Sequence, residues 1–136
     1  MFKTVLFPVD ESREVRDAVS TVVDLVKNYQ SRLVILSVVE NNTNEESTDK
    51  TIMSNKENVD KLLEGYKRVF SEKDIQAEVV EREGMPSFTI CDVADEFSVN
   101  LIVMGCRGIG LTTEGATESV TNRVIHLSPC PVLIIP

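Results

Sequence analysis

Short apolar runs alternate along the chain with segments whose apolar residues recur every three or four positions. The runs at 4–9, 32–39, 101–104 and 131–136 are nearly continuous, as is typical of strands buried on both faces of a sheet. The segment 76–81 carries charges at alternate positions, which favours a strand at the sheet edge. Because strands and helices alternate throughout, the sequence predicts an open parallel sheet with helices on both faces and right-handed crossovers.

Four segments have the period of an amphipathic helix. The first is expected to begin after an N-cap at Ser12 and to end near Gln30, although its valines are weak helix formers. The third follows a turn at Gly84, with Pro86 at its first position, and the fourth ends before Pro129. The apolar positions that define the four helices are Val15, Ala18, Val19, Val22, Val23 and Val26; Val59, Leu62, Leu63, Tyr66, Val69 and Phe70; Ile90, Val93, Ala94 and Phe97; and Val120, Val124 and Leu127.

The size and composition predict a single domain over residues 1–136, since domains usually run to roughly 100–150 residues. With 42% apolar and 26% charged residues, the chain is ordinary for a globular protein. No apolar run reaches the roughly 20 residues that cross a membrane, and residues 1–10 do not form a signal peptide pattern. We therefore expect a cytoplasmic protein. The polar, acidic segment 40–51 is expected to be the longest loop.

The charge balance narrows the choice of partner. Fourteen basic residues against 22 acidic ones give a net charge of −8, which disfavours nucleic acids and anionic lipid surfaces. A nucleotide would need local hydrogen-bond donors or a divalent cation to overcome this field. Cys91, Cys106 and Cys130 are odd in number and widely spaced, so the sequence predicts reduced thiols rather than disulfides or a metal site.

The segment 101–119 carries the strongest functional signal. It predicts a buried strand that runs into a loop containing Gly105 and Gly108 and then into the last helix. Free backbone N–H groups and the positive end of a helix dipole are how many α/β proteins hold phosphate. In an open parallel sheet the ligand lies at the carboxyl ends of the strands, which we expect at Asp10, at Val39 with Glu40, at Glu81 and at Gly105.

Three segments together resemble the universal stress protein family from end to end: FPVDES, EGMPSFTICDVADEFSVNLIVMGCRG and SPCPVLIIP. The resemblance implies a doubly wound sheet of five parallel strands, in the order 3-2-1-4-5, with four helices. It also implies a homodimer joined along the last strand, Val132–Ile135. Some members of the family bind ATP and others do not.

The ATP-binding members share a signature of glycine, two residues, glycine, nine residues, and then glycine followed by serine or threonine. It maps here onto Gly105, Gly108, Glu118 and Ser119, so three of four positions match. The resemblance implies that both glycines approach the phosphates and that Ser119 donates its hydroxyl. It further places Asp10 beside the adenosine and the backbone of Val38 beside the adenine ring, with Mg²⁺ or Mn²⁺ accompanying the ATP.

Two side chains in this signature have more than one interpretation. Arg107 either pairs with a phosphate or stays in solvent, and Cys106 is either a spectator or an oxidation sensor.

Glu118 departs from the signature. Its carboxylate would repel phosphate by roughly 4 kcal/mol per pair at about 4 Å. That repulsion is avoided if the side chain turns to solvent or if Gly115 supplies a rearranged loop. Alternatively, Thr117 caps the last helix and Glu118 complements its dipole, so that the protein fills its own anion site. The second hypothesis is therefore a dimeric interaction protein that binds no nucleotide.

A phosphate-accepting receiver domain is a weaker alternative. Asp10 beside Glu11 resembles part of its acidic pocket, but such a domain also needs an aspartate after the third strand and a lysine after the fifth. This chain has Glu81 and Glu83 at the first place and Pro136 at the second. Fold likeness alone gives little support to this reading.

The sequence offers no pairing of a nucleophile with a base. Ser87, Ser98 and Ser119 have no histidine at motif spacing, and His126 is the single histidine of the chain. We therefore expect at most weak ATP hydrolysis rather than a dedicated enzyme.

Overall fold

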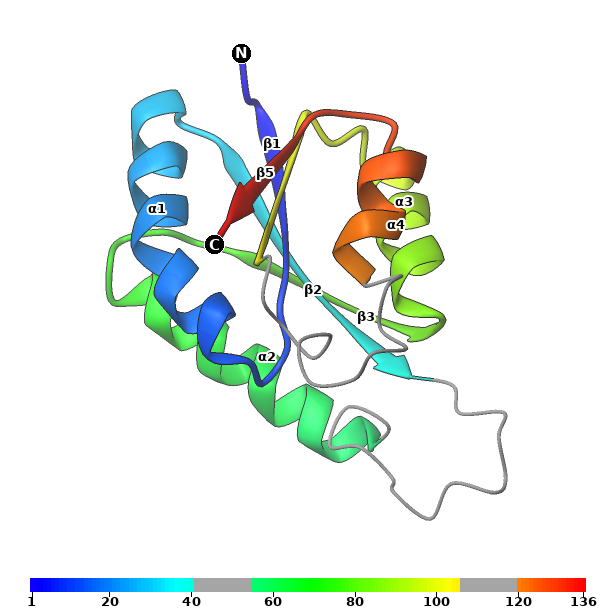
Figure 1. The fold of residues 1–136 in the computed structure, drawn as a ribbon. Helices are drawn as coiled ribbons and strands as arrows, with labels where there is room; N and C mark the ends of the chain where they lie inside the picture. Colours follow the sequence, from blue (N-terminus) through cyan, green and yellow to red (C-terminus); the bar gives the residue numbers. More distant parts are fainter. Residues whose placement is uncertain (41–54, 106–119) are drawn as a thin grey trace.

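Five parallel strands form one sheet in the order β3-β2-β1-β4-β5 (Figure 1). This order is seen in a computed structural model, which describes residues 1–40, 55–105 and 120–136. The order and the parallel arrangement confirm the predicted fold class. The strands are β1 (Thr4–Pro8), β2 (Arg32–Glu40), β3 (Glu78–Gly84), β4 (Leu101–Gly105) and β5 (Val132–Ile135).

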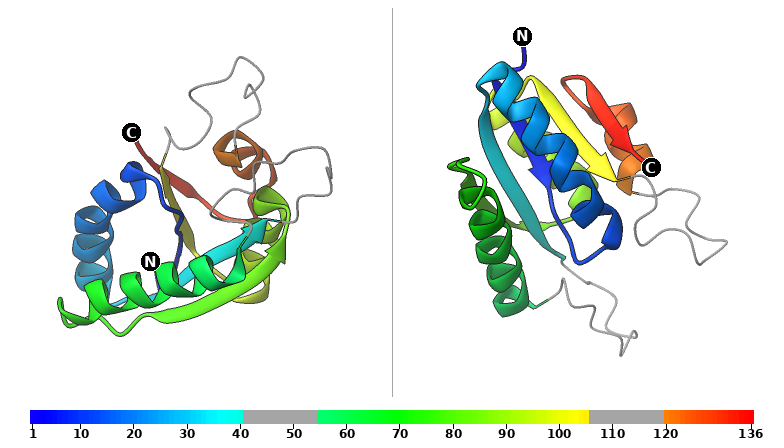
Figure 2. Two further views of the ribbon diagram at one scale, coloured as in Figure 1. Left: turned by 90° about the horizontal axis from the view of Figure 1, so that it is seen from below. Right: turned by 90° about the vertical axis from the view of Figure 1, so that its left-hand side faces the viewer.

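The helices cover both faces of the sheet in pairs. α1 and α2 pack on one face, and α3 and α4 pack on the other (Figures 1 and 2). The three inner strands are therefore covered on both faces, which explains why β1, β2 and β4 are nearly continuous apolar runs. The helices are α1 (Arg13–Tyr29), α2 (Lys56–Ser71), α3 (Pro86–Glu96) and α4 (Val120–Leu127).

The face under α1 and α2 is built around aromatic rings. Phe7 of β1 and Phe70 of α2 are fully buried, and their ring centroids lie 6.1 Å apart at 90°. Tyr66, one turn before Phe70, meets Phe7 edge to face at 6.4 Å. Such edge-to-face pairs are the favoured geometry of aromatic contacts and add to the stability gained from burial.

The face under α3 and α4 is filled by aliphatic side chains and methionine. Leu36, Ile102 and Met104 of the strands meet Ile90 of α3 and Val124 of α4. Among the described residues, no fully buried member of this cluster is aromatic. The core on this face is therefore aliphatic, whereas the core on the opposite face contains the rings of Phe7, Tyr66 and Phe70.

The third strand runs further than the sequence predicted. It was expected at 76–81, but β3 spans Glu78–Gly84 because β2 continues to Glu40, which pairs with Gly84. Glu81 accordingly lies in the middle of the strand, opposite Ser37, and its predicted place at the carboxyl end is wrong. The position of β3 at one edge of the sheet is confirmed.

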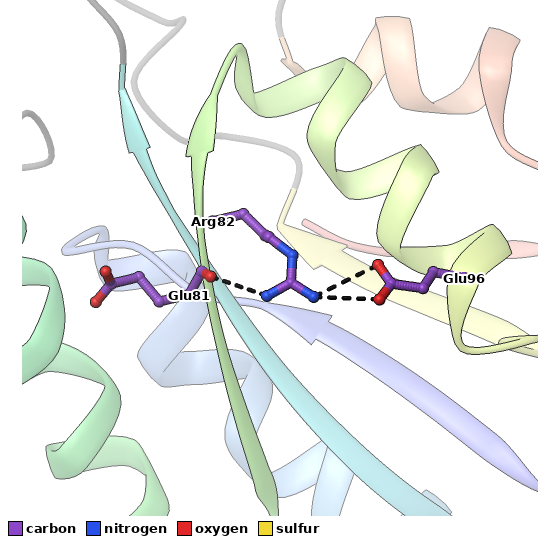
Figure 3. Close-up of polar contacts among 3 residues, drawn as sticks. All are labelled: Glu81, Arg82 and Glu96. Atoms are coloured by element: carbon purple, nitrogen blue, oxygen red, sulfur yellow. Dashed lines mark hydrogen bonds and ion pairs between the residues drawn. The ribbon is translucent and has the colours of Figure 1, made fainter.

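Charged side chains of β3 point to opposite faces of the sheet (Figure 3). Arg82 Nη2 lies 3.3 Å from Glu96 Oε1 on α3, and Arg82 Nη1 donates to the carbonyl oxygen of Glu81 at 3.1 Å. The Glu81 carboxylate points to the other side, where it lies 3.7 Å from Lys56 Nζ at the start of α2. Both charges thus tie the edge strand to a helix instead of facing a ligand.

The two helices on the aromatic face begin differently. Asn55 caps α2 by accepting a hydrogen bond from the Glu57 N–H at 2.9 Å. Ser12 occupies the N-cap of α1 as predicted, but its hydroxyl makes no capping hydrogen bond. α1 ends as expected, with Gln30 in the left-handed conformation at its C-cap.

The predicted loop 40–51 cannot be compared in full, because Glu40 is the last residue of β2 and 41–54 lie outside the described residues. In the part of the chain that the structure describes, no helix has the length and apolar character to cross a membrane.

Candidate nucleotide site

The strand order of the sheet reverses between β1 and β4. From β1 the order proceeds to β2 and β3 on one side, and β4 and β5 follow on the other. Open α/β sheets bind ligands at the carboxyl ends of the two strands where the order reverses. Asp10 follows β1 here, and Gly105 is the last residue of β4.

Asp10 is fixed at the start of α1. Its Oδ1 accepts a hydrogen bond from the Ser12 N–H at 2.7 Å, which forms a local turn from strand to helix. The exit of β1 is tied to β2 as well, since Val9 N–H donates to the Leu36 carbonyl at 2.8 Å and Ser37 Oγ donates to the Val9 carbonyl at 3.0 Å. The half-buried carboxylate keeps a second oxygen for another contact.

β2 continues past the end of β1 and exposes one side of its backbone. The last register pair of the two strands is Pro8 with Leu36, whereas β2 stays paired to β3 as far as Glu40. The Leu36 carbonyl points toward β1, because it accepts the Val9 N–H.

Backbone groups two residues apart in a strand point the same way, so the N–H and C=O of Val38 also face the β1 side. Within the described residues these two groups have no hydrogen-bond partner. The Val38 side chain is 5% exposed and packs under α3.

Gly105 lies where α1 packs closely on β4. A Cβ at this position would lie 3.0 Å from Glu14 Cβ, tighter than ordinary van der Waals contact. Its carbonyl accepts a hydrogen bond at 2.8 Å from Thr121 Oγ1, in the first turn of α4. Glu14 and Thr121 were not identified from the sequence, because both contacts join residues distant along the chain.

Several carboxylates lie near one another at the carboxyl ends of β1 and β2. Partial burial raises the pKa of the Glu11 carboxyl, and the negative charges of Asp10 and then Glu40 raise it further. Burial also raises the pKa of Tyr66, which lies near enough to Asp10 for that charge to raise it too, while Arg16 lowers it. The described part of the edge is thus predominantly negative.

Several predicted site residues lie outside the described residues: Arg107, Gly108, Glu118 and Ser119, together with Cys106, Gly115 and Thr117. The structure places Asp10, Val38 and Gly105 together at the carboxyl end of the sheet. Among the residues it describes, no group of three acidic, histidine or cysteine side chains could hold a metal ion.

The family model for universal stress proteins matches residues 1–136. The chain belongs to the universal stress protein family. The chain is 61% identical to the universal stress protein Sll1654 of Synechocystis, and the alignment covers all of this chain and 87% of that protein. The universal stress protein YxiE of Bacillus subtilis is 35% identical, with 99% of both chains covered.

Solved universal stress protein structures have the same fold. A structure of UspA from Lactobacillus plantarum covers 99% of this chain and 98% of its own, with a TM-score of 0.73 and 25% identity. A universal stress protein in complex with cAMP has a TM-score of 0.73 at 20% identity, covering 99% of this chain and 97% of its own. One from Archaeoglobus fulgidus in complex with dAMP has a TM-score of 0.67 at 19% identity, with 99% and 98% coverage.

Proposed function

We propose that this universal stress protein is a regulatory module that binds an adenine nucleotide, ATP, at the carboxyl ends of β1 and β4. The observation that carries the proposal is the backbone of Val38, which has no hydrogen-bond partner among the described residues and faces the side of β2 where β1 has ended. One N–H and one C=O on the same strand edge match the acceptor and donor pair that adenine presents on one side of its ring.

Other features support the same site. Asp10 is held beside this edge with one carboxylate oxygen left for a ribose hydroxyl. Two proteins of this fold bind adenine nucleotides, cAMP in one and dAMP in the other. Gly105, Arg107, Gly108 and Ser119 are proposed to surround the phosphates, and Glu118 would turn away from them.

The proposed cation is Mg²⁺ or Mn²⁺ carried by the nucleotide. Mg²⁺ is usually bound by substrate phosphates together with one or two carboxylates and water. Asp10 is the described carboxylate placed to serve as such a ligand, and the cation would offset the negative field that Glu11 and Glu40 create.

Calorimetric titration with ATP and Mg²⁺ tests the proposal. We expect Asp10→Ala to weaken binding by about tenfold, because it removes a charged hydrogen-bond partner. Asp17→Ala, on the exposed side of α1, is the matched control and should bind as the unmodified protein does. An absence of heat and of competition at millimolar nucleotide would rule out ATP as the ligand.

Glu118→Gly separates this function from the alternative, an interaction protein whose anion site is filled by its own carboxylate. If the unmodified protein and the variant bind ATP equally, Glu118 points away from the phosphates. Binding that appears only in the variant would support the alternative.

We also propose that two copies associate through β5. All four residues of this edge strand are half-buried and apolar. The Pro131 carbonyl accepts the Ile102 N–H at 3.0 Å, so the alternating backbone of Ile134 faces outward. An apolar edge with free backbone groups invites pairing with another strand.

Ile134→Pro tests this association, because proline removes the outward N–H. Ile134→Ala is the control, since it shortens the same side chain and keeps the donor. Light scattering at concentrations on the order of tens of micromolar should show dimers for the unmodified protein and fewer for the proline variant than for the control. A monomer in the unmodified protein would contradict the proposal.

Reduced thiols favour the cytoplasm as the compartment for this function. Cys91 and Cys130 are both free and half-buried, and burial raises the pKa of each thiol. Disulfides form and persist in secreted proteins and are rare in cytosolic ones.

A further inference from the structure

Ser87 is buried without a hydrogen-bond partner. The residue is 1% exposed, and its hydroxyl oxygen has no partner among the described residues. An unpaired buried hydroxyl destabilises the folded protein, because it loses its hydrogen bonds to water and gains none in return. Such a group is uncommon in folded proteins and requires an explanation.

The position of Ser87 links it to the proposed nucleotide site. It is the second residue of α3, which begins directly after the carboxyl end of β3 (Figure 1). Ser87 lies seven residues before Ala94, two turns along one helix face, and both side chains are buried. That face packs on the side of the sheet that carries Val38. Ser87 therefore lies on the helix face that packs on the sheet, in the first turn of α3.

Neither the N-cap nor the first turn of α3 contributes a side chain that would neutralise its positive end. Met85 at the N-cap offers no side-chain cap, Pro86 has no N–H, and the first turn contains no acidic residue. The positive end of the helix dipole thus favours a hydrogen-bond acceptor in front of it. The core cluster on this face of the sheet, which includes Val38 and Ile90, is apolar, which suits a flat heterocyclic ring better than a hydrated phosphate.

We propose that the Ser87 hydroxyl donates a hydrogen bond to a ring nitrogen of the bound adenine. This inference rests on the proposed nucleotide function and adds a group that selects the base. The bound ring would supply the acceptor that the hydroxyl lacks, and the Val38 backbone would hold a different edge of the same ring. Ser87 is then a specificity-determining residue contributed by α3, outside the glycine signature.

Ser87→Ala provides the test, with opposite effects expected on stability and on binding. Without nucleotide, the variant should melt about 3 °C or more above the unmodified protein, because it removes an unpaired buried oxygen. Its affinity for ATP should fall by about two- to tenfold. Ser20→Ala, an exposed serine within α1, is the matched control and should bind ATP unchanged. A serine with a purely structural role would not combine higher stability with weaker binding.

Deaza analogues of ATP, each with one ring nitrogen replaced by C–H at position 1, 3 or 7, identify the acceptor. One analogue should bind the unmodified protein more weakly than ATP and bind Ser87→Ala as ATP does. Equal ATP affinity in Ser87→Ala and the unmodified protein would overturn the inference and leave the nucleotide proposal standing. A loss of affinity with no such coupling to any analogue would overturn it as well. If the unmodified protein binds no adenine nucleotide, both proposals fail together.

Discussion

The two faces of the sheet are filled in different ways. Under α1 and α2, the rings of Tyr66 and Phe70 pack edge to face against Phe7 of β1. Under α3 and α4, aliphatic side chains fill the layer, and at its carboxyl end Ser87 remains without a partner. The difference indicates that the first face mainly stabilises the fold. The second combines apolar packing with a buried hydroxyl, that of Ser87, which has no partner among the described residues.

The largest effect that would test this contrast is the loss of an aromatic ring. Phe7→Ala should lower the free energy of unfolding by about 3–5 kcal/mol, because it removes a fully buried ring and leaves a cavity. Phe88→Ala, a 50% exposed ring on α3, is the matched control and should cost less than about 1 kcal/mol. Urea denaturation of both variants makes the comparison. Equal losses would show that the buried Phe7 ring stabilises the fold no more than an exposed ring does.

A smaller effect separates the two helix starts on the aromatic face. Asn55→Ala should destabilise by about 1 kcal/mol, because it removes the acceptor of the Glu57 N–H. Ser12→Ala should change the stability little, since the Ser12 hydroxyl makes no capping hydrogen bond. Thermal unfolding of the two variants measures the difference. An equal loss in Ser12→Ala would mean that its hydroxyl does cap α1 in solution.

Two glycines should respond with opposite signs to alanine. Gly65 lies within α2 with no atom inside 4 Å of an added Cβ. Gly65→Ala should therefore stabilise the protein by about 0.5–1 kcal/mol. At Gly105 the added methyl would meet Glu14 Cβ at 3.0 Å, so Gly105→Ala should destabilise it. Chemical denaturation distinguishes the two signs, and a stabilised Gly105→Ala would show that α1 shifts freely from β4.

The smallest effect concerns pH and the carboxylates at the binding edge. The pKa of Glu11 is already raised in the folded protein, and a bound polyanion would raise it further. The complex should therefore take up a proton, and ATP affinity should increase as the pH falls from 7 toward the raised pKa. A single group of this kind changes the affinity by less than about tenfold.

Glu11→Gln is the variant that isolates this effect, because it removes the titrating group at nearly constant volume. Calorimetry at pH 7 and pH 5 should show a flatter dependence in Glu11→Gln than in the unmodified protein. An identical pH dependence in both would show that Glu11 does not sense the ligand.

Much of the fold could be predicted because buried strands and amphipathic helices have distinct periods. The continuous apolar runs located β1, β2 and β4, and the charges of β3 indicated an edge strand. The prediction failed where strand length depends on a neighbour. β3 reaches Gly84 only because β2 extends to Glu40, which places Glu81 in the middle of a strand.

The candidate site was predictable in part. Asp10 and Gly105 stand at strand ends that the sequence located, and the family resemblance indicated Val38. The resemblance did not indicate that the backbone of Val38 has no partner within the described residues. This follows from the register, because β1 stops pairing with β2 at Pro8 and Leu36. Arg107, Gly108, Glu118 and Ser119 remain predictions.

The sequence by itself determined the alternation of elements, the family and the residues that follow the central strands, because these depend on local patterns. The tertiary structure decided which polar groups at the carboxyl ends of the strands have a hydrogen-bond partner. Gly105 lies where α1 packs closely on β4, and its carbonyl is bound by Thr121. The Val38 backbone and the Ser87 hydroxyl are left unpaired within the described structure. Hydrogen bonding between segments distant along the chain depends on strand register and helix placement, and no local pattern contains that information.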